Sequence, residues 1–174
     1  LLVERTVDHF GRLDVAFNNA GIGGPSLPLA DYPPDDWAHV INTNLSGVFF
    51  GMQHQIKAML RTGGGSIVNM ASILGAVGFG TACAYTAAKH GVVGLTQVAA
   101  LDYGTHGIRV NAVGPGFIHT PMVDNSLDPA IQEVLATKHA MGRMGTSEEV
   151  AALVDGVTKL DKLDFTDREE QKAP

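Results

Sequence analysis

The chain is poor in cysteine, in clustered positive charge and in long apolar stretches. Cys83 is its single cysteine, so no disulfide can form within the chain, and we expect a reducing, cytoplasmic location. The 12 Lys and Arg residues are outnumbered by 18 Asp and Glu residues, and they form no basic run that would bind a phosphate backbone. No stretch of about 18 apolar residues is present, so we expect no membrane-spanning helix. Nucleic acids and membranes are therefore not expected as partners.

The composition is that of a globular protein without an obvious metal site. Of the 174 residues, 45% are hydrophobic and 17% are charged, which suits one folded domain. The seven histidines show no metal-ligand spacing, so we interpret them as surface or loop residues and expect no metal.

The hydrophobic pattern predicts strands that alternate with helices. Short apolar runs predict strands over residues 13–18, 66–71 and 108–113. Helical spacing predicts helices over residues 1–11, 35–60 (with Asp35 as N-cap), 84–103, 129–139 and 147–154. This alternation is typical of an α/β fold, in which a Rossmann-like, doubly wound parallel sheet lies between two helix layers. We assign residues 1–154 to this domain and expect residues 155–174 to be a charged, poorly ordered tail.

Tyr85, Lys89 and Ser72 are the strongest candidates for catalysis. Tyr85 and Lys89 lie four residues apart in a predicted helix, so they share a face, and the ammonium group would lower the pKa of the phenol. Such a tyrosine exchanges a proton with an alcohol or carbonyl oxygen near neutral pH. Ser72 follows a predicted strand, at the edge where such sheets bind ligands, and its hydroxyl could hydrogen-bond a substrate oxygen. A solvated Tyr–Lys pair and a turn serine are the ordinary alternatives.

Asparagine and glycine mark further strand ends and one helix. The turn Asn18-Asn19-Ala20-Gly21 follows the first strand, and its glycine permits close approach to a ligand. Residues 111–116 end the third strand in a similar way. Both stretches could equally be plain turns. Asn44 lies on the apolar stripe of the 35–60 helix, either as a buried structural amide or as a link through water to the site lysine.

Together these stretches resemble the classical short-chain dehydrogenase/reductase family. The matching motifs are Asn18-Asn19-Ala20-Gly21, Asn42-Thr43-Asn44-Leu45, Ser72 with Tyr85-Thr86-Ala87-Ala88-Lys89, Ile108-Arg109-Val110-Asn111 and Pro115-Gly116-Phe117-Ile118-His119-Thr120. The resemblance covers about residues 1–154. It implies an oxidoreductase that interconverts a secondary alcohol and a ketone by hydride transfer, with NAD or NADP as cofactor.

The resemblance also implies a role for each matching residue. Tyr85 would be the general acid/base, Lys89 would lower its pKa and bind the nicotinamide ribose, and Ser72 would position the substrate oxygen. Asn44 would hold a water molecule in a proton relay to Lys89. The residues implied for cofactor binding are Asn18, Ala20, Gly21, Tyr85, Lys89, Pro115, Gly116, Ile118 and Thr120. The resemblance also implies a homodimer or homotetramer. In the family, the helices that correspond to residues 35–60 and 84–103 usually form the subunit contacts.

The sequence departs from the family pattern towards both ends. Gly21-Ile22-Gly23-Gly24 lacks the spacing and the following helix of a pyrophosphate-binding turn, and no other Gly-rich strand–turn–helix is present. No final Gly-rich strand follows residue 154. We therefore expect a truncated chain that binds cofactor weakly. The alternatives are a catalytically silent fragment acting at most as a helix-mediated interaction module, and a binder of some other nucleotide.

The stretch over residues 121–145 carries apolar side chains whose role the sequence leaves open. They predict either a lid over the site or the core face of a short helix, and we favour helix core. The side chains are Met122, Val123, Leu127, Ile131, Leu135 and Met141.

Overall fold

The computed structural model describes residues 2–124 and 127–159, and its centre is a parallel sheet of three strands. The strands β1 (Val15–Asn18), β2 (Gly65–Met70) and β3 (Ile108–Val113) lie side by side in chain order. Asn18 pairs with Asn69 and Met70 pairs with Val113, so the carboxyl ends of the strands meet at one edge.

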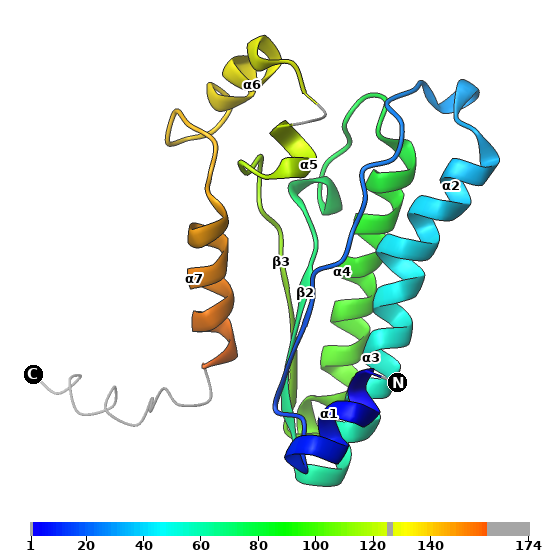
Figure 1. Ribbon diagram of the computed structural model, residues 1–174, viewed down its shortest axis with the longest axis vertical. Coiled ribbons are helices and arrows are strands. Elements are labelled where there is room, and N and C mark those ends of the chain that lie inside the picture. Colours follow the sequence, from blue (N-terminus) through cyan, green and yellow to red (C-terminus); the bar gives the residue numbers. More distant parts are fainter. Residues whose placement is uncertain (1, 125–126, 160–174) are drawn as a thin grey trace, which may run out of the picture.

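Helices cover both faces of the sheet. Figure 1 shows α3 (Gly47–Thr62) and α4 (Cys83–Tyr103) on one face and α7 (Ser147–Thr158) on the other. The α1 helix (Leu2–Phe10) packs against α3. The core lies between the sheet and the α3–α4 layer, and its members include Met52, Ile56, Met59, Ile67, Val92 and Ile108. The expected Rossmann-like α/β class is confirmed.

The helix predicted over residues 35–60 is a helical run interrupted by a π-helical turn. It consists of α2 (Pro34–Ile41), the π turn η2 (Asn42–Ser46) and α3. The run begins at Pro34, so the prediction of Asp35 as N-cap is wrong. Proline suits the first helical position because its φ is already helical and it has no N–H to satisfy. The run ends at Gly63, whose φ of 90° is left-handed and favours glycine.

The remaining elements follow the predicted order with shifted ends. The predicted 84–103 helix begins at Cys83, and the predicted 129–139 helix ends at Ala136. The short elements are η1 (Leu29–Asp31), η3 (Ile73–Gly75), η4 (Gly104–His106), α5 (Pro121–Asp124) and α6 (Pro129–Ala136).

The last described helix extends beyond its predicted end at residue 154. At its start, Thr146 and Glu149 form a reciprocal capping box. At its end, the Arg109 guanidinium donates to the carbonyls of Val157 at 2.9 Å and Thr158 at 3.2 Å. These carbonyls have no partners within a helix, so an arginine from β3 stabilises a last turn that the sequence pattern does not show. The predicted tail began at residue 155, but residues 155–158 are helical, and residues 160–174 lie outside the described part.

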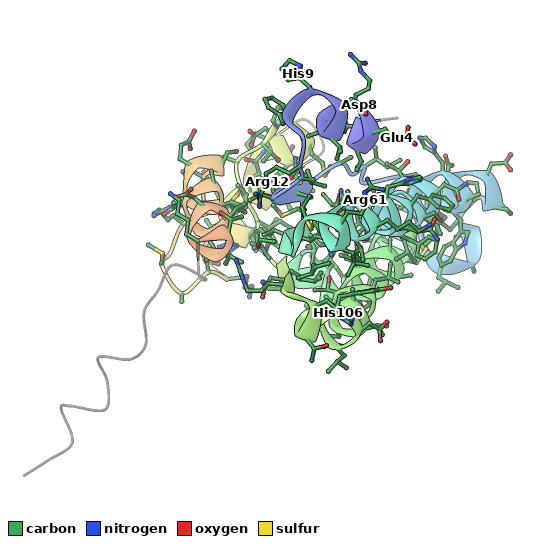
Figure 2. The ribbon with its side chains drawn as sticks, turned by 90° about the horizontal axis from the view of Figure 1, so that it is seen from below. Glu4, Asp8, His9, Arg12, Arg61 and His106 are labelled. Carbon is green, nitrogen blue, oxygen red and sulfur yellow. The ribbon has the colours of Figure 1, made fainter. Side chains whose placement is uncertain are left out.

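The end of the molecule at the amino termini of the strands shows no convergent site. Figure 2 shows Glu4, Asp8 and His9 projecting from α1 on one side of this end, and His106 projecting on the opposite side. Within residues 2–124 and 127–159, no three His, Cys, Asp or Glu side chains gather where a metal ion could bind. Over the same residues, no helix has the length and apolar character needed to cross a membrane.

Candidate active site

A cleft of about 580 Å³ opens at the carboxyl ends of the strands, where the sequence analysis expected a ligand. Its walls come from the turn after β1, the end of β2, α4, and the loop after β3. The predicted site residues that line it are Ala20, Gly21, Ser72, Tyr85, Lys89, Pro115, Gly116, Ile118 and Thr120. Two predicted site residues, Asn18 and Asn44, do not line it.

Tyr85, Lys89 and Ser72 meet in this cleft. Lys89 lies one helical turn after Tyr85 on α4, and its Nζ is 5.4 Å from the centroid of the tyrosine ring. The lysine is only 3% exposed, and its Nζ donates a hydrogen bond to the Met70 carbonyl at 2.7 Å. The Ser72 hydroxyl accepts from the Leu74 amide at 3.2 Å and also interacts with the Tyr85 phenol. The three side chains therefore present two hydroxyls and one ammonium group to a single cleft.

Burial controls the acidity of both titratable groups. It lowers the pKa of Lys89 to about 8, because the charged ammonium loses its hydration. It raises the pKa of Tyr85 above its usual value, and the hydrogen bond with Ser72 opposes that rise only in part. The pKa of Tyr85 therefore lies above its usual value, opposite to the predicted direction, although the Lys89 ammonium lies one helical turn away. The physical reason is that the phenolate would lose more hydration than the neighbouring groups replace.

Asn44 supports the cleft from behind. It is fully buried, its Oδ1 accepts from the Ile22 amide at 2.8 Å, and its Nδ2 donates to the Ile22 carbonyl at 2.8 Å. A Cβ added to Gly21 would lie 3.3 Å from Asn44 Oδ1 and 3.7 Å from Lys89 Nζ, so the turn after β1 packs closely on both residues. The side chain of Asn44 thus holds both main-chain groups of Ile22 in place. The π turn that carries it is a kind of irregularity frequent at functional sites.

Asn18 faces a buried polar network instead of the cleft. Its Nδ2 donates to Gln55 Oε1 at 3.0 Å and to Asn69 Oδ1 at 2.8 Å, and its Oδ1 accepts from Gln55 Nε2 at 2.7 Å. Asn69 donates in turn to Thr96 Oγ1 at 3.0 Å. This network joins β1, β2, α3 and α4 directly behind the site. The network was not predicted from the sequence, although a polar residue such as Asn69 within an apolar strand was a usable signal.

The wall contributed by α7 was also missed. Ser147, Val150, Ala151 and Val154 line the cleft, and their spacing of three and four residues marks one helical face. That spacing was visible in the sequence, but the helix was assigned no part in the site.

Some of the apolar side chains between residues 121 and 145 fit one of the two alternatives, lid or helix core, and others fit neither. Met122 and Val123 line the cleft, as a lid would. Leu135 is buried, as helix core would be. Ile131 and Met141 are 48% and 72% exposed and fit neither alternative.

Comparisons with known proteins show the family of the chain. A family model described as "Enoyl-(Acyl carrier protein) reductase" matches residues 1–155. The chain belongs to the short-chain dehydrogenase/reductase family, as its motifs predicted.

Individual relatives and solved structures are similar to most of the chain. It is similar to a cyclohexanol dehydrogenase of Acinetobacter sp. (strain SE19), at 45% identity over 152 residues, covering 87% of this chain and 59% of the relative. The crystal structure of levodione reductase matches with a TM-score of 0.88 and 43% identity, covering 91% of this chain and 64% of that one. The structure of ElxO with NADP bound matches with a TM-score of 0.85 and 36% identity, covering 92% and 65%. The chain thus spans about 60% of the length of its curated relatives.

Proposed function

We propose that the complete protein is an NAD(P)-dependent oxidoreductase that interconverts a secondary alcohol and a ketone. The observation that carries this proposal is the buried Lys89 ammonium beside the Tyr85 phenol, in a cleft that also contains the Ser72 hydroxyl. A protein that only binds some other nucleotide would not need a tyrosine, a lysine and a serine together in one cleft. The relatives named as cyclohexanol dehydrogenase and levodione reductase support the same reaction class.

The residues of the cleft suit the nicotinamide and ribose end of the cofactor. Lys89 offers an ammonium donor for ribose hydroxyls, and Gly21 and Gly116 allow close approach of the main chain. The cleft volume is within the range of about 300–1,000 Å³ that small-molecule sites have. The cofactor, when bound, would supply or accept the hydride.

The chain itself would handle the proton. In ketone reduction, the Tyr85 hydroxyl would donate its proton to the carbonyl oxygen, while Ser72 donates a hydrogen bond to the same oxygen. In alcohol oxidation, Tyr85 would accept that proton. Since burial raises the pKa of Tyr85, positive charge near the phenol is needed for proton release near neutral pH, and the Lys89 ammonium is one such charge. As the family resemblance implies, a water held near Asn44 would connect Lys89 to a proton relay.

The apolar part of the cleft favours an uncharged, carbon-rich substrate. The residues that line the cleft include Phe17, Met122, Val123, Val150 and Val154. Among the described lining residues, Lys89 is the only charged one, and its Nζ is already hydrogen-bonded to Met70. A cyclic alcohol such as cyclohexanol is therefore the first substrate to test.

The decisive experiment compares Tyr85→Phe with the unchanged complete protein. We expect Tyr85→Phe to lower turnover of cyclohexanol about 100-fold or more, because the proton acceptor is removed. The affinity for NADH or NADPH, followed by fluorescence, should change little, because the ring and Lys89 stay in place. Unchanged turnover would remove Tyr85 from its role, and absence of nucleotide binding by the unchanged protein would overturn the whole proposal.

We also propose that the complete protein forms a homodimer or homotetramer in a cytoplasmic setting. An apolar groove between the η2–α3 segment and α4 supports the assembly, and it is lined by Leu45, Ser46, Phe49, Phe50, Gly91, Gly94, Leu95 and Val98. Gly94 has no side chain and faces open space, which allows a partner helix to approach closely. Light scattering tests this assembly, and Phe50→Glu should reduce the measured mass, since Phe50 is 57% exposed at this groove.

A further inference from the structure

Four of the hydrogen bonds that hold the loop after β3 to the rest of the chain involve the main chain of Pro115 and Phe117 or the His119 amide. Three join main-chain atoms: the Ile73 amide donates to Pro115, the Gly145 amide donates to Phe117, and the His119 amide donates to Gly145. The fourth comes from the Phe117 amide, which donates to Nε2 of His139 at 3.2 Å. His139 therefore contacts the main chain of the loop whose residues Pro115, Gly116 and Ile118 line the cleft.

The approach of the imidazole is close and depends on Gly116. A Cβ added to Gly116 would lie 2.8 Å from Cε1 and 3.3 Å from Nε2 of His139. A real side-chain carbon is not tolerated at the first of these distances, so only glycine lets the ring approach the loop. The ring also lies near the Phe117 side chain, with centroids 6.1 Å apart. His139 follows α6, so it joins the segment after that helix to the loop that lines the cleft.

We propose that His139 is a positioning residue, which fixes the Gly116–Phe117 main chain in the shape that the nicotinamide end of the cofactor requires. This proposal rests on the function proposed above. Because the Phe117 N–H donates to Nε2, the imidazole acts as an acceptor, and the side chain is needed in its neutral form with the proton on Nδ1. His139 was predicted to be a surface or loop residue, and it does lie in a loop. Its contact with the Phe117 amide was not predicted.

The first test removes the acceptor and then restores it. In the complete protein, we compare His139→Leu with His139→Gln, whose amide oxygen can replace Nε2 as an acceptor. Hydrogen–deuterium exchange of a peptide covering residues 115–119 should be about fivefold faster in His139→Leu, the equivalent of about one hydrogen bond, and close to normal in His139→Gln. His106→Leu is the matched control, because this exposed histidine lies at the opposite end of the molecule (Figure 2) and should change nothing.

The second measurement asks whether the contact matters for the cofactor. The Kd for NADPH or NADH, measured by fluorescence, should rise about fivefold in His139→Leu and less than about twofold in His139→Gln. The KM for the nucleotide should follow the Kd while kcat stays near normal, since Tyr85 and Ser72 are untouched. The exchange experiment contains no nucleotide, so its result does not depend on the proposed function. If the proposed function is wrong, no variant will bind nucleotide, but the exchange rates will still test the contact of His139 with the loop.

A pair of smaller changes gives an independent test. Gly116→Ala places a methyl group against the imidazole, so it should raise the Kd for the nucleotide. That rise should be at least about threefold smaller in a His139→Ala background, where the ring is already gone. Equal effects of Gly116→Ala in both backgrounds would overturn the proposal. So would normal exchange in His139→Leu, or a His139→Gln variant as impaired as His139→Leu.

Discussion

Replacing Lys89 by methionine should make the complete protein more stable and inactive at the same time. Lys89 is 3% exposed, and its pKa falls from the usual 10.5 to about 8. Holding the proton at neutral pH therefore costs the folded state about 3 kcal/mol, at about 1.4 kcal/mol for each pK unit. The methionine variant also loses the hydrogen bond from Nζ to the Met70 carbonyl, which lowers its free energy of unfolding by about 1 kcal/mol. The expected net gain at pH 7 is about 2 kcal/mol in the free energy of unfolding.

The stability difference between the two proteins should depend on pH. Between pH 8 and 10.5 the unfolded chain keeps the lysine proton while the folded chain has lost it, so stability rises with pH. Below pH 8 both states are protonated and the full cost remains. The methionine variant lacks this rise, so its advantage over the unchanged protein should shrink steadily from pH 8 towards pH 10.

Urea unfolding of both proteins at pH 7, 8, 9 and 10 measures the effect. Lys57→Met is the matched control, because Lys57 is exposed on α3 and its replacement should leave stability nearly unchanged. Turnover should be lost in Lys89→Met and kept in Lys57→Met. A Lys89→Met protein that is less stable at pH 7, or whose advantage is the same at every pH, would refute the reasoning from burial.

Three further changes test other parts of the site. Ser72→Ala should lower kcat for ketone reduction about 100-fold and move the alkaline limb of that reaction's pH–rate profile upward, because protonated Tyr85 is the donor and Ser72 lowers its pKa; an unmoved limb would contradict this. Asn69→Leu should cost about 1–3 kcal/mol in urea unfolding, since it leaves buried amide groups of the network without partners, and a neutral result would show that the network is dispensable. Asn44→Ala should weaken nucleotide binding by freeing both main-chain groups of Ile22, which a binding titration would detect; unaltered affinity would argue against this support.

The sequence was sufficient to predict the helices and strands and to predict which residues of one motif lie together. β3 was predicted at its observed bounds, and Tyr85 and Lys89 were placed on one helical face, because spacing alone decides which residues share a face. The location of the cleft followed from a rule about parallel sheets. These are properties of local pattern and chain order, which a sequence displays directly.

The parts that the sequence did not predict depend on contacts between distant segments. Asn18 was assigned to the cofactor, but its amide pairs with Gln55 and Asn69, residues 37 and 51 positions away. The last turn of α7 depends on Arg109, 48 residues earlier. The Tyr85 pKa was predicted in the wrong direction because spacing shows a neighbouring charge but not the hydration that a side chain loses.

The most direct measurement is a crystal structure of the complete protein with its reduced cofactor and a ketone or an unreactive analogue. The proposed mechanism predicts that Tyr85 Oη and Ser72 Oγ both lie within about 3.2 Å of the ligand oxygen, with Lys89 Nζ against the ribose. A ligand oxygen held by other groups, with these two hydroxyls directed elsewhere, would contradict it.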